Sequence, residues 1–350
     1  MKCFYHDDLD GNAAAFCVHA WVGIKPPAGR LIRAIRDMRL DIQGVDFRAI
    51  NYGTEFPFDD IIPNEQVWIV DYSIEPDEMR RLLEITSDVT WIDHHKTAIE
   101  KYADFPHNIR GIRKDGEAGC VLAWKYIHWN TQRGDGEERF GDMGDPCPYN
   151  NRDNMPVPRM IALVGDRDVW KWEYGEETRF FFAGSQLHDT SPGSKFWWKC
   201  MDHETKDLPP PNTGNRDARI RGEQWWAQLL RDGETVEKYK TQSDTGINES
   251  LGYDVTFEGM PCWAINRARV SSDRLGDRIK QYDILLPHYY DGKKWTVSLY
   301  SEKVDVSVIA KRYGGGGHKG ASGFQCDVLP WTENQEQRGA DVEDTDTSNA

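Results

Sequence analysis

Long apolar runs are missing from this sequence of 350 residues. No stretch reaches the roughly 18 consecutive apolar residues of a typical membrane-spanning helix. The N-terminus also lacks the basic and apolar regions of a secretory signal peptide. These absences argue against a membrane protein and against a secreted protein, so we expect a cytoplasmic protein with no membrane partner.

Cysteine pairs are missing as well. The seven cysteines are odd in number, lie far apart along the chain and are never spaced as C-x-x-C. This pattern argues against a disulfide framework and against a zinc site built from thiolates. We expect reduced, mostly buried thiols at Cys3, Cys17, Cys120, Cys147, Cys200, Cys262 and Cys326.

Basic residues are too few for a protein that coats long duplex nucleic acid. The 43 Lys and Arg residues face 58 Asp and Glu residues, a formal net charge of −15, whereas such coating depends on many phosphate contacts from Lys and Arg. A short anionic ligand remains compatible because it needs only a local cationic site or bound metal ions. Part of the acidity lies in residues 331–350, where six acids accompany one arginine, and we expect a disordered acidic tail there.

The length of the chain predicts two domains, because one hydrophobic core usually stops growing beyond about 250–300 residues. The best boundary is DLPPPNTGN at 207–215, which is rich in Pro and Asn. We predict a first domain over 1–206, a linker and connecting helix over 207–248, and a second domain over 249–330. The Gly-, Asp-, Asn- and Pro-rich segment 131–158 is predicted to be a surface loop, since its acids lack the spacing of an EF-hand calcium loop.

Apolar runs in the first half of the chain repeatedly end in acids and histidines. Short β-branched and aromatic runs alternate there with helical patterns such as PDEMRRLLEI and GCVLAWKYIHW, which predicts an α/β fold with a parallel sheet sandwiched by helices. Ligands of such sheets bind at the carboxyl ends of the strands, so the polar clusters should converge in space. The junctions are CFY before His6, Asp8 and Asp10; VWIV before Asp71; VTWI before Asp93, His94 and His95; and IALVG before Asp166.

The junction HDDLDGNAAAF at 6–16 indicates the chemistry. Side chains at positions 6, 8 and 10 would share one face if the strand continued, and the run after Gly11 begins a helix whose first amides can hold anionic groups. Carboxylates crowded beside a histidine are costly unless positive charge neutralises them. Oxygen ligands with one or two imidazoles suit Mn²⁺ or Mg²⁺, and several bridging carboxylates suit two ions, which can hydrolyse a phosphoester. Helix capping is the alternative for a single Asp, but it does not explain why histidines recur beside the acids.

Five short motifs span nearly the whole chain apart from its tail: HDDLDG at 6–11, VDYS at 70–73, IDHHK at 92–96, GDRDVW at 165–170 and GGGGHKGASG at 314–323. In this order they resemble the motifs of the DHH phosphoesterase superfamily, in its branch with a DHHA1 second domain. The resemblance implies a DHH metal-binding catalytic domain, a smaller α/β DHHA1 substrate-binding domain, and an active site in the cleft between them.

The resemblance also implies two divalent metal ions, Mn²⁺ before Mg²⁺, and a role for each motif. One ion would be held by His6, Asp8 and Asp71. The other would be held by Asp10, Asp71, His94 and an acid of GDRDVW, for which Asp166 is preferred and Asp168 is the alternative. His95 would lie over the scissile phosphate as a hydrogen-bond donor or general acid, and Asp93 would orient the two histidines.

The glycine run Gly314 to Gly317 can bring backbone amides close to a ligand. The resemblance implies that this loop holds the nucleotide of the substrate. The alternative is a flexible turn. Arg267 and Arg269 in INRARV could add local positive charge, or they belong to a solvated face. The predicted substrate-binding residues are Gly315, Gly316, Gly317, His318, Lys319, Arg267 and Arg269.

We therefore predict a two-metal-dependent phosphodiesterase that hydrolyses short single-stranded oligonucleotides or small nucleotides, similar to nanoRNases, with a 3′,5′-bisphosphonucleotide as a further substrate. The runner-up is a single-strand-specific 5′ exonuclease: the single residue between His6 and Asp8 favours it, whereas the acidic balance and the absence of an evident OB-type domain disfavour it. A cyclic dinucleotide phosphodiesterase and a non-catalytic nucleotide-binding regulatory module are further alternatives. Whether the chain forms a homodimer stays open.

Overall fold

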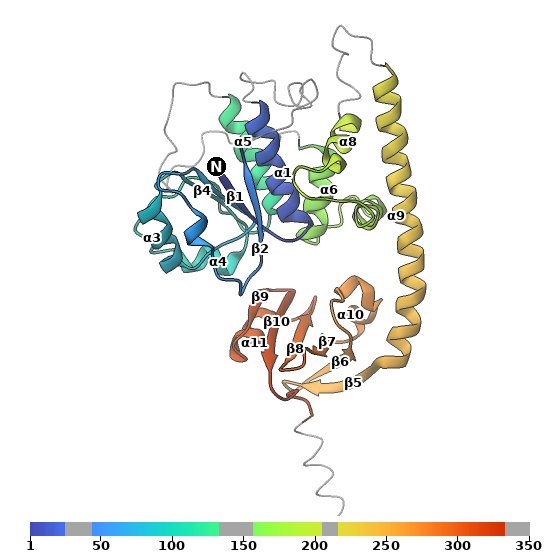
Figure 1. Cartoon of the computed structure of the whole chain (residues 1–350). Coiled ribbons are helices and arrows are strands. Elements are labelled where there is room, and N and C mark those ends of the chain that lie inside the picture. Colours follow the sequence, from blue (N-terminus) through green and yellow to red (C-terminus); the bar gives the residue numbers. More distant parts are fainter. Residues whose placement is uncertain (25–43, 133–156, 205–215, 333–350) are drawn as a thin grey trace, which may run out of the picture. The chain divides into compact units, whose positions relative to one another are not determined.

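The computed structural model describes residues 1–24, 44–132, 157–204 and 216–332, and it divides into two compact units, Met1–Glu237 and Lys238–Ala350 (Figure 1). Each unit has its own sheet and its own hydrophobic core. Most of the predicted surface loop, the predicted boundary DLPPPNTGN and nearly all of the predicted acidic tail lie outside the described residues.

The first unit contains a four-stranded sheet in the order β2-β1-β3-β4, in which every neighbouring pair is parallel. Three of its strands are the predicted runs CFY, VWIV and VTWI, and their residues are almost all buried, as expected of parallel strands covered on both faces. The strands are β1 (Lys2–His6), β2 (Asp46–Ile50), β3 (Val67–Val70) and β4 (Val89–Ile92).

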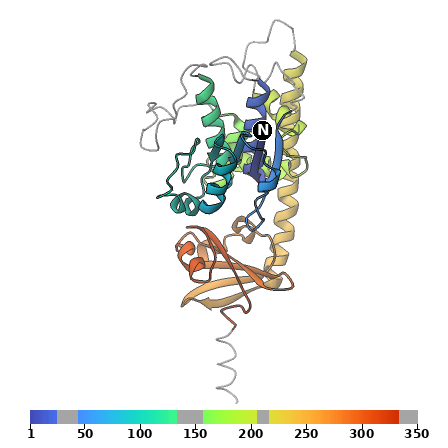
Figure 2. The same cartoon turned by 60° about the vertical axis from the view of Figure 1, so that its left-hand side comes forward.

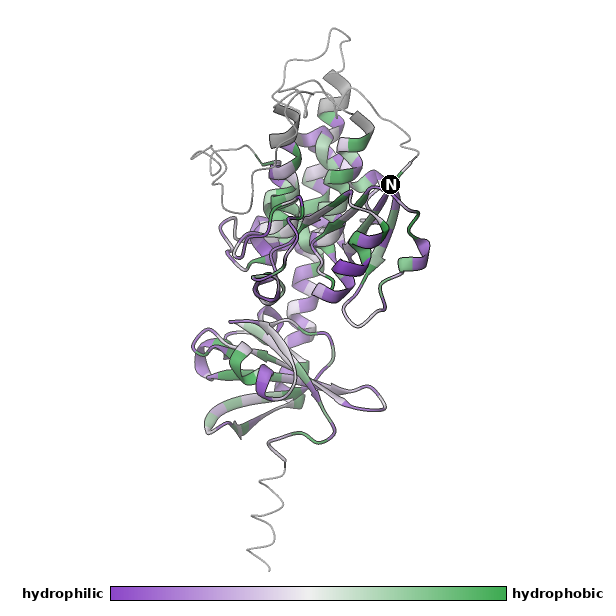
Figure 3. Cartoon of the chain, turned by 90° about the vertical axis from the view of Figure 1, so that its left-hand side faces the viewer, coloured by the Kyte–Doolittle hydropathy of each residue, from purple (hydrophilic) through white to green (hydrophobic). Residues whose placement is uncertain are grey.

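Helices cover both faces of this sheet, which confirms the predicted sandwich. Val70 of β3 packs into a core with α1, α5, α6, α7 and α8, whereas its neighbour Ile69 packs into a second core with Leu82 of α3. Hydrophobic residues accordingly concentrate in the strands and in the helices against them (Figure 3). The helices are α1 (Leu9–Ile24), η1 (Phe58–Asp60), α3 (Pro76–Ile85), α4 (Lys96–Lys101), α5 (Gly119–Gln132), α6 (Arg159–Asp168), α7 (Glu176–Ser185) and α8 (Lys195–Glu204).

The register of the sheet places the ends of three strands at the same level. Val70 pairs with Tyr5 on one side and with Ile92 on the other. The residues that follow these three along the chain therefore lie side by side at the carboxyl edge of the sheet. They are His6, Asp71 and Asp93.

The prediction that IALVG is a strand is wrong, because these residues lie within α6. Met160, Ile161, Leu163 and Val164 are buried on one face at helical spacing, and a short apolar run does not distinguish a buried strand from a buried helix. The fourth strand is β2, which the apolar pattern missed. It is an edge strand whose only buried residue is Ile50.

The helix α9 (Arg216–Leu251) has 36 residues and includes the division between the two units. Its Trp226 and Leu229 are buried in the core of the first unit. Further along, the side-chain amide of Asn248 donates to the carbonyl oxygen of Arg274 at 2.8 Å. Across the described residues, no helix combines the length and the apolar character that a membrane crossing requires.

The second unit contains a mixed six-stranded sheet in the order β5-β6-β7-β8-β10-β9, with α11 against one face (Figure 2). The segments YDVTFEG and MPCWAIN form neighbouring antiparallel strands, and a hairpin turns around Asp291 and Gly292. Part of the predicted glycine loop forms the edge strand β9. The elements are β5 (Gly252–Phe257), β6 (Met260–Asn266), η3 (Ser272–Leu275), α10 (Arg278–Gln281), β7 (Ile284–Tyr290), β8 (Trp295–Tyr300), α11 (Val306–Arg312), β9 (Gly316–His318) and β10 (Ala321–Cys326).

Candidate metal centre

The first motif lies where β1 ends and α1 begins. The helix starts at Leu9, so Asp8 and Asp10 are presented by a tight strand-to-helix turn and not by a continued strand. A Cβ atom on Gly11 would lie 2.0 Å from the carbonyl oxygen of His6, which explains why this turn requires glycine. The Gly11 amide donates to Asp8 Oδ1 at 2.8 Å, and Asp8 Oδ2 lies 2.9 Å from His6 Nδ1.

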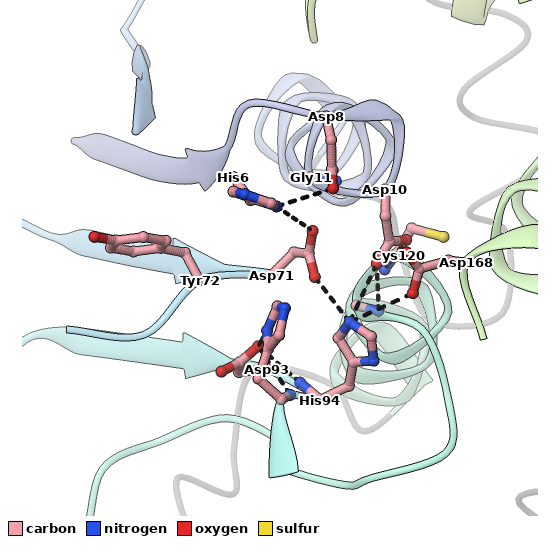
Figure 4. A network of polar contacts seen from close by, with 12 residues as sticks. His6, Asp8, Asp10, Gly11, Asp71, Tyr72, Asp93, His94, Cys120 and Asp168 are labelled. Atoms are coloured by element: carbon pink, nitrogen blue, oxygen red, sulfur yellow. Dashed lines mark hydrogen bonds and ion pairs between the residues drawn. The ribbon is translucent and has the colours of Figure 1, made fainter. Parts of the chain in front are cut away.

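Asp71 lies at the centre of the polar network in Figure 4. Its side chain is 1% exposed, and its backbone has a left-handed φ of 53°. Oδ1 lies 3.2 Å from His94 Nε2, and Oδ2 lies 3.9 Å from His6 Nδ1. Within the described part of the chain neither oxygen accepts a hydrogen bond. Burial, followed by the negative charges of Asp10 and Asp8, raises the pKa of Asp71 well above its usual range, so the charged form requires a nearby cation.

A second group of candidate ligands meets Asp71 from three other elements. Asp10 belongs to α1, His94 follows β4, and Asp168 is the last residue of α6. His94 Nε2 lies 3.8 Å from Asp10 Oδ2 and 3.4 Å from Asp168 Oδ2. Burial lowers the pKa of His94, which favours the neutral imidazole that binds metal. Burial and the charge of Asp10 raise the pKa of Asp168 well above its usual range.

The N-terminus of α5 fixes the position of Asp10. The backbone amides of Gly119 and Cys120 donate to its two carboxylate oxygens at 2.8 and 3.0 Å. The positive end of the helix dipole therefore faces this acidic cluster. A Cβ atom on Gly119 would lie 2.7 Å from Asp71 Oδ1. The helix reaches the cluster because residue 119 has no side chain.

Asp93 fixes the orientation of the His95 ring through a hydrogen bond. Its fully buried carboxylate accepts hydrogen bonds from the backbone amide of His94 at 2.8 Å, from the Ser73 hydroxyl and from His95 Nδ1 at 2.7 Å. Burial acts to lower the pKa of His95, but the hydrogen bond and the charge of Asp93 outweigh it, so the pKa is raised. The Nδ1 side of the His95 ring is therefore fixed against Asp93.

Of the two acids of GDRDVW, the structure places Asp168, the alternative, beside the cluster, and the preferred Asp166 elsewhere. The Asp166 carboxylate accepts hydrogen bonds from the amides of Glu173 and Tyr174, at 2.7 and 3.3 Å, and from the hydroxyl of Thr178, so it ties the loop after α6 to α7. Residues two apart on a helix point about 200° apart. Only one of the two acids can therefore face the cluster, and it is Asp168.

The side chains fit a pair of divalent ions. Each of three groups has one ligand atom per residue within 4.8 Å of the others. Oxygen donors with imidazoles suit Mn²⁺ or Mg²⁺, and the Asp71 oxygens without donors supply negative charge that a cation would balance. The cluster can thus bind divalent metal. The groups are His6, Asp8 and Asp71; Asp10, His94 and Asp168; and Asp71, His94 and His95.

The predicted substrate-binding residues belong to the second unit. Gly317 has a φ of 136°, and a Cβ atom on Gly315 would lie 2.0 Å from the Gly323 carbonyl oxygen, so glycine is required at both positions. Arg267 forms an ion pair with Asp244 of α9 and donates to Asn248, which gives it a structural role. Arg269, His318 and Lys319 are exposed.

The motifs did not predict the contacts of Ser73 and of the amides that begin α5, or the position of Tyr52 beside His6 and His95. Ser73 belongs to the motif VDYS, but its hydroxyl donates a hydrogen bond to Asp93, which follows a different strand. The amides of α5 are backbone groups, so no residue type in the sequence indicates their contact with Asp10. Tyr52 follows β2, the strand that the apolar pattern overlooked.

Comparison with known proteins extends the motif evidence. No family model matches the chain. The chain is 23% identical over 288 residues to the uncharacterized protein R106 of Acanthamoeba polyphaga mimivirus, which covers 78% of this chain and 56% of that protein. It is 22% identical over 281 residues to the oligoribonuclease NrnB of Bacillus subtilis strain 168, which covers 74% of this chain and 59% of that protein. The chain therefore spans less than two thirds of the length of these two relatives.

One solved structure that aligns with this chain is a DHH domain from a member of the s1p family of ribosomal proteins. It has 14% sequence identity and a TM-score of 0.48, and the alignment covers 100% of this chain and 87% of that chain. The pGpG-specific phosphodiesterase PggH from Vibrio cholerae has 11% identity and a TM-score of 0.39, with 99% of each chain covered. Two further observations are consistent with the order of the motifs. Four of the motifs meet at one sheet edge, and the sequence similarity extends over about three quarters of the chain. In its motifs and in its parallel α/β sheet the chain resembles the DHH phosphoesterase superfamily.

Proposed function

We propose that this protein is a divalent-metal-dependent phosphodiesterase that hydrolyses short single-stranded oligonucleotides or small nucleotides. The observation that carries the proposal is the position of Asp71, whose two carboxylate oxygens face His6 on one side and His94 on the other. A buried carboxylate with one oxygen toward each of two ligand groups is suited to bridging two ions.

Two ions fit the available ligands, with Asp71 shared between them. His6 and Asp8 complete the first set, and Asp10, His94 and Asp168 complete the second. When bound, such a pair supplies Lewis acidity toward a phosphoryl oxygen and lowers the pKa of water. Mn²⁺ is our first choice and Mg²⁺ the second, because the imidazoles favour the softer of the two.

The protein's own residues have complementary tasks. His95, with its raised pKa, is suited to donate a proton or a hydrogen bond from Nε2 to the phosphate or its leaving oxygen. Asp93 orients the ring through Nδ1 and stabilises its positive charge. The amides of Gly119 and Cys120 hold Asp10 against its carboxylate neighbours. The proposed reaction therefore depends on groups that are already held in place in the folded chain.

A short nucleotide substrate is favoured over a long strand by two observations. The chain is acidic overall, with a net charge of −15, whereas tracking a long strand requires a positively charged groove. The related protein NrnB is named an oligoribonuclease. We further propose that the second unit supplies the nucleotide contacts, through the backbone of Gly315 to Gly317 and through His318 and Lys319. A processive 5′ exonuclease is the second candidate, favoured by the short spacing of the first motif.

A substrate screen with a site variant tests the proposal. Purified protein with Mn²⁺, Mg²⁺ or EDTA would be assayed on dinucleotides, a length series of single strands, a cyclic dinucleotide and a bisphosphonucleotide. We expect metal-dependent hydrolysis that is fastest on the shortest strands, abolished in Asp71→Asn and retained in the control Asp59→Asn, which changes an exposed aspartate. Wild-type turnover in Asp71→Asn, or no hydrolysis of any phosphodiester by the wild type, would refute it; a preference for long strands would favour the exonuclease.

A further inference from the structure

Tyr52 is an exposed aromatic residue at the edge of the metal centre. Its ring centroid lies 5.6 Å from that of His6 and 5.7 Å from that of His95, the proposed ligand and the proposed proton donor. The side chain nevertheless remains 52% exposed. No part of the proposed chemistry described above uses it.

A β-turn places this ring. The amide of Thr54 donates to the carbonyl oxygen of Asn51 at 3.1 Å, and Gly53, with a φ of 86°, takes the position that requires a left-handed backbone. The carbonyl oxygen of Ile50 at the end of β2 accepts from the amide of Asp7, 3.3 Å away in the first motif. The turn that carries Tyr52 is therefore attached to the turn that carries the ligands.

A second tyrosine supports the ring from the protein side. Tyr72, which is 4% exposed, lies 4.8 Å from Tyr52 at an interplanar angle of 35°. Burial, followed by the charges of Asp93 and Asp71, raises the pKa of Tyr52, and the backbone amide of Ser73 acts against this rise. The Tyr52 ring is thus in contact with Tyr72, and about half of the side chain stays on the surface.

Core packing does not explain this exposure. The nearby aromatic residues Phe56 and Phe58 are 2% and 6% exposed, and they pack into the core against α3. A ring that served only to fill space would be buried in the same way. An exposed aromatic ring beside the proposed metal centre offers a stacking surface to a nucleobase, since every base has a π-face.

We propose that Tyr52 stacks on a nucleobase of the substrate, next to the phosphate held at the metal centre, and so selects nucleotides over other phosphoesters. This inference rests on the proposed function. It makes Tyr52 a residue that binds substrate through its ring, and its hydroxyl takes no part in proton transfer. Removal of the ring should therefore matter only when the substrate carries a base.

The test compares Tyr52→Ala, Tyr52→Phe and the control Tyr239→Ala, which removes a 72% exposed tyrosine from α9. Each is assayed with Mn²⁺ on a dinucleotide and on the same phosphodiester with one or the other base replaced by an abasic sugar, and Mn²⁺ binding is measured by calorimetry. Stacking on an aromatic residue predicts a loss in kcat/KM of roughly 5- to 150-fold for Tyr52→Ala on the dinucleotide, mainly through KM. One abasic substrate should show almost no loss, and Tyr52→Phe and the control should resemble the wild type.

Three results would overturn the inference. They are equal losses in Tyr52→Ala on the dinucleotide and on both abasic substrates, a loss in Tyr52→Phe as large as in Tyr52→Ala, or a drop in Mn²⁺ affinity that accounts for the lost turnover. Failure of the proposed function has a different signature, because the wild type would then hydrolyse none of these substrates. Tyr52 would in that case have no base to select.

Discussion

The close approach of Gly119 to Asp71 allows a prediction with a magnitude. An alanine Cβ at position 119 would lie 2.7 Å from both Cβ and Oδ1 of Asp71, about 0.7 Å short of the 3.4 Å at which ordinary contact begins. Neither side can move freely. The amides at 119 and 120 donate to Asp10, and the Asp71 amide donates to the Ile92 carbonyl at 2.8 Å.

The displacement is large on the scale of metal coordination. Ligand distances in a metal site are held to about ±0.2 Å, so a shift of this size should move the Asp71 carboxylate out of place. We expect Gly119→Ala to weaken Mn²⁺ binding by roughly 10- to 100-fold, the usual effect of disturbing the support of a ligand. Overpacking costs about 1–3 kcal/mol, and the better helix propensity of alanine offsets up to ~1 kcal/mol, so the metal-free protein should lose only about 0–2 kcal/mol.

Calorimetric titration with Mn²⁺ and urea denaturation in EDTA would measure the two effects separately. The matched control is Gly246→Ala in α9, where a Cβ atom meets nothing within 4 Å, and which should be neutral or slightly stabilising. Wild-type Mn²⁺ affinity in Gly119→Ala would refute the reasoning. So would a loss of affinity that merely follows global unfolding in EDTA.

Two further predictions concern the remaining acids of the centre. Asp168→Asn should lose Mn²⁺ affinity and turnover with no loss of stability in EDTA. Asp166→Asn should lose roughly 1–3 kcal/mol of stability, because it weakens hydrogen bonds to a buried carboxylate. Mn²⁺ titration and urea denaturation of both variants measure the two effects, and the reverse pattern would contradict the assignment. Asp93→Asn should shift the alkaline limb of the kcat profile to lower pH, because His95 acts when protonated, loses its proton as the pH rises through its raised pKa, and owes that raised pKa to Asp93. An unmoved alkaline limb at saturating Mn²⁺ would show that His95 is not the proton donor.

The convergence of most of the cluster's acids and histidines could be predicted from the sequence for a simple geometric reason. His6, Asp71 and His94 follow apolar runs, and in a parallel sheet the carboxyl ends of neighbouring strands meet at one edge. Once the runs before Asp71 and His94 were assigned to strands, their convergence followed from the fold class. The histidines beside the acids then indicated metal binding.

Other features depended on details of local geometry that periodicity does not resolve. The run IALVG is equally apolar as a strand or as a helix, and it forms a helix, in which Asp168 rather than Asp166 faces the cluster. The strand β2 escaped notice because an edge strand does not need an apolar sequence. Tyr52, which follows it, was overlooked for the same reason.

Residue types and short patterns along the chain were enough to predict the α/β organisation, the acids and histidines at the ends of three strands, and the order of the five motifs. The helix that supports Asp10, the need for glycine at residue 119 and the aromatic ring beside the cluster became evident only from the packing of the folded chain. The bond from Gly119 to Asp10 joins residues 109 positions apart. Contacts of that kind are set by how whole elements pack, and no local pattern in the chain encodes them.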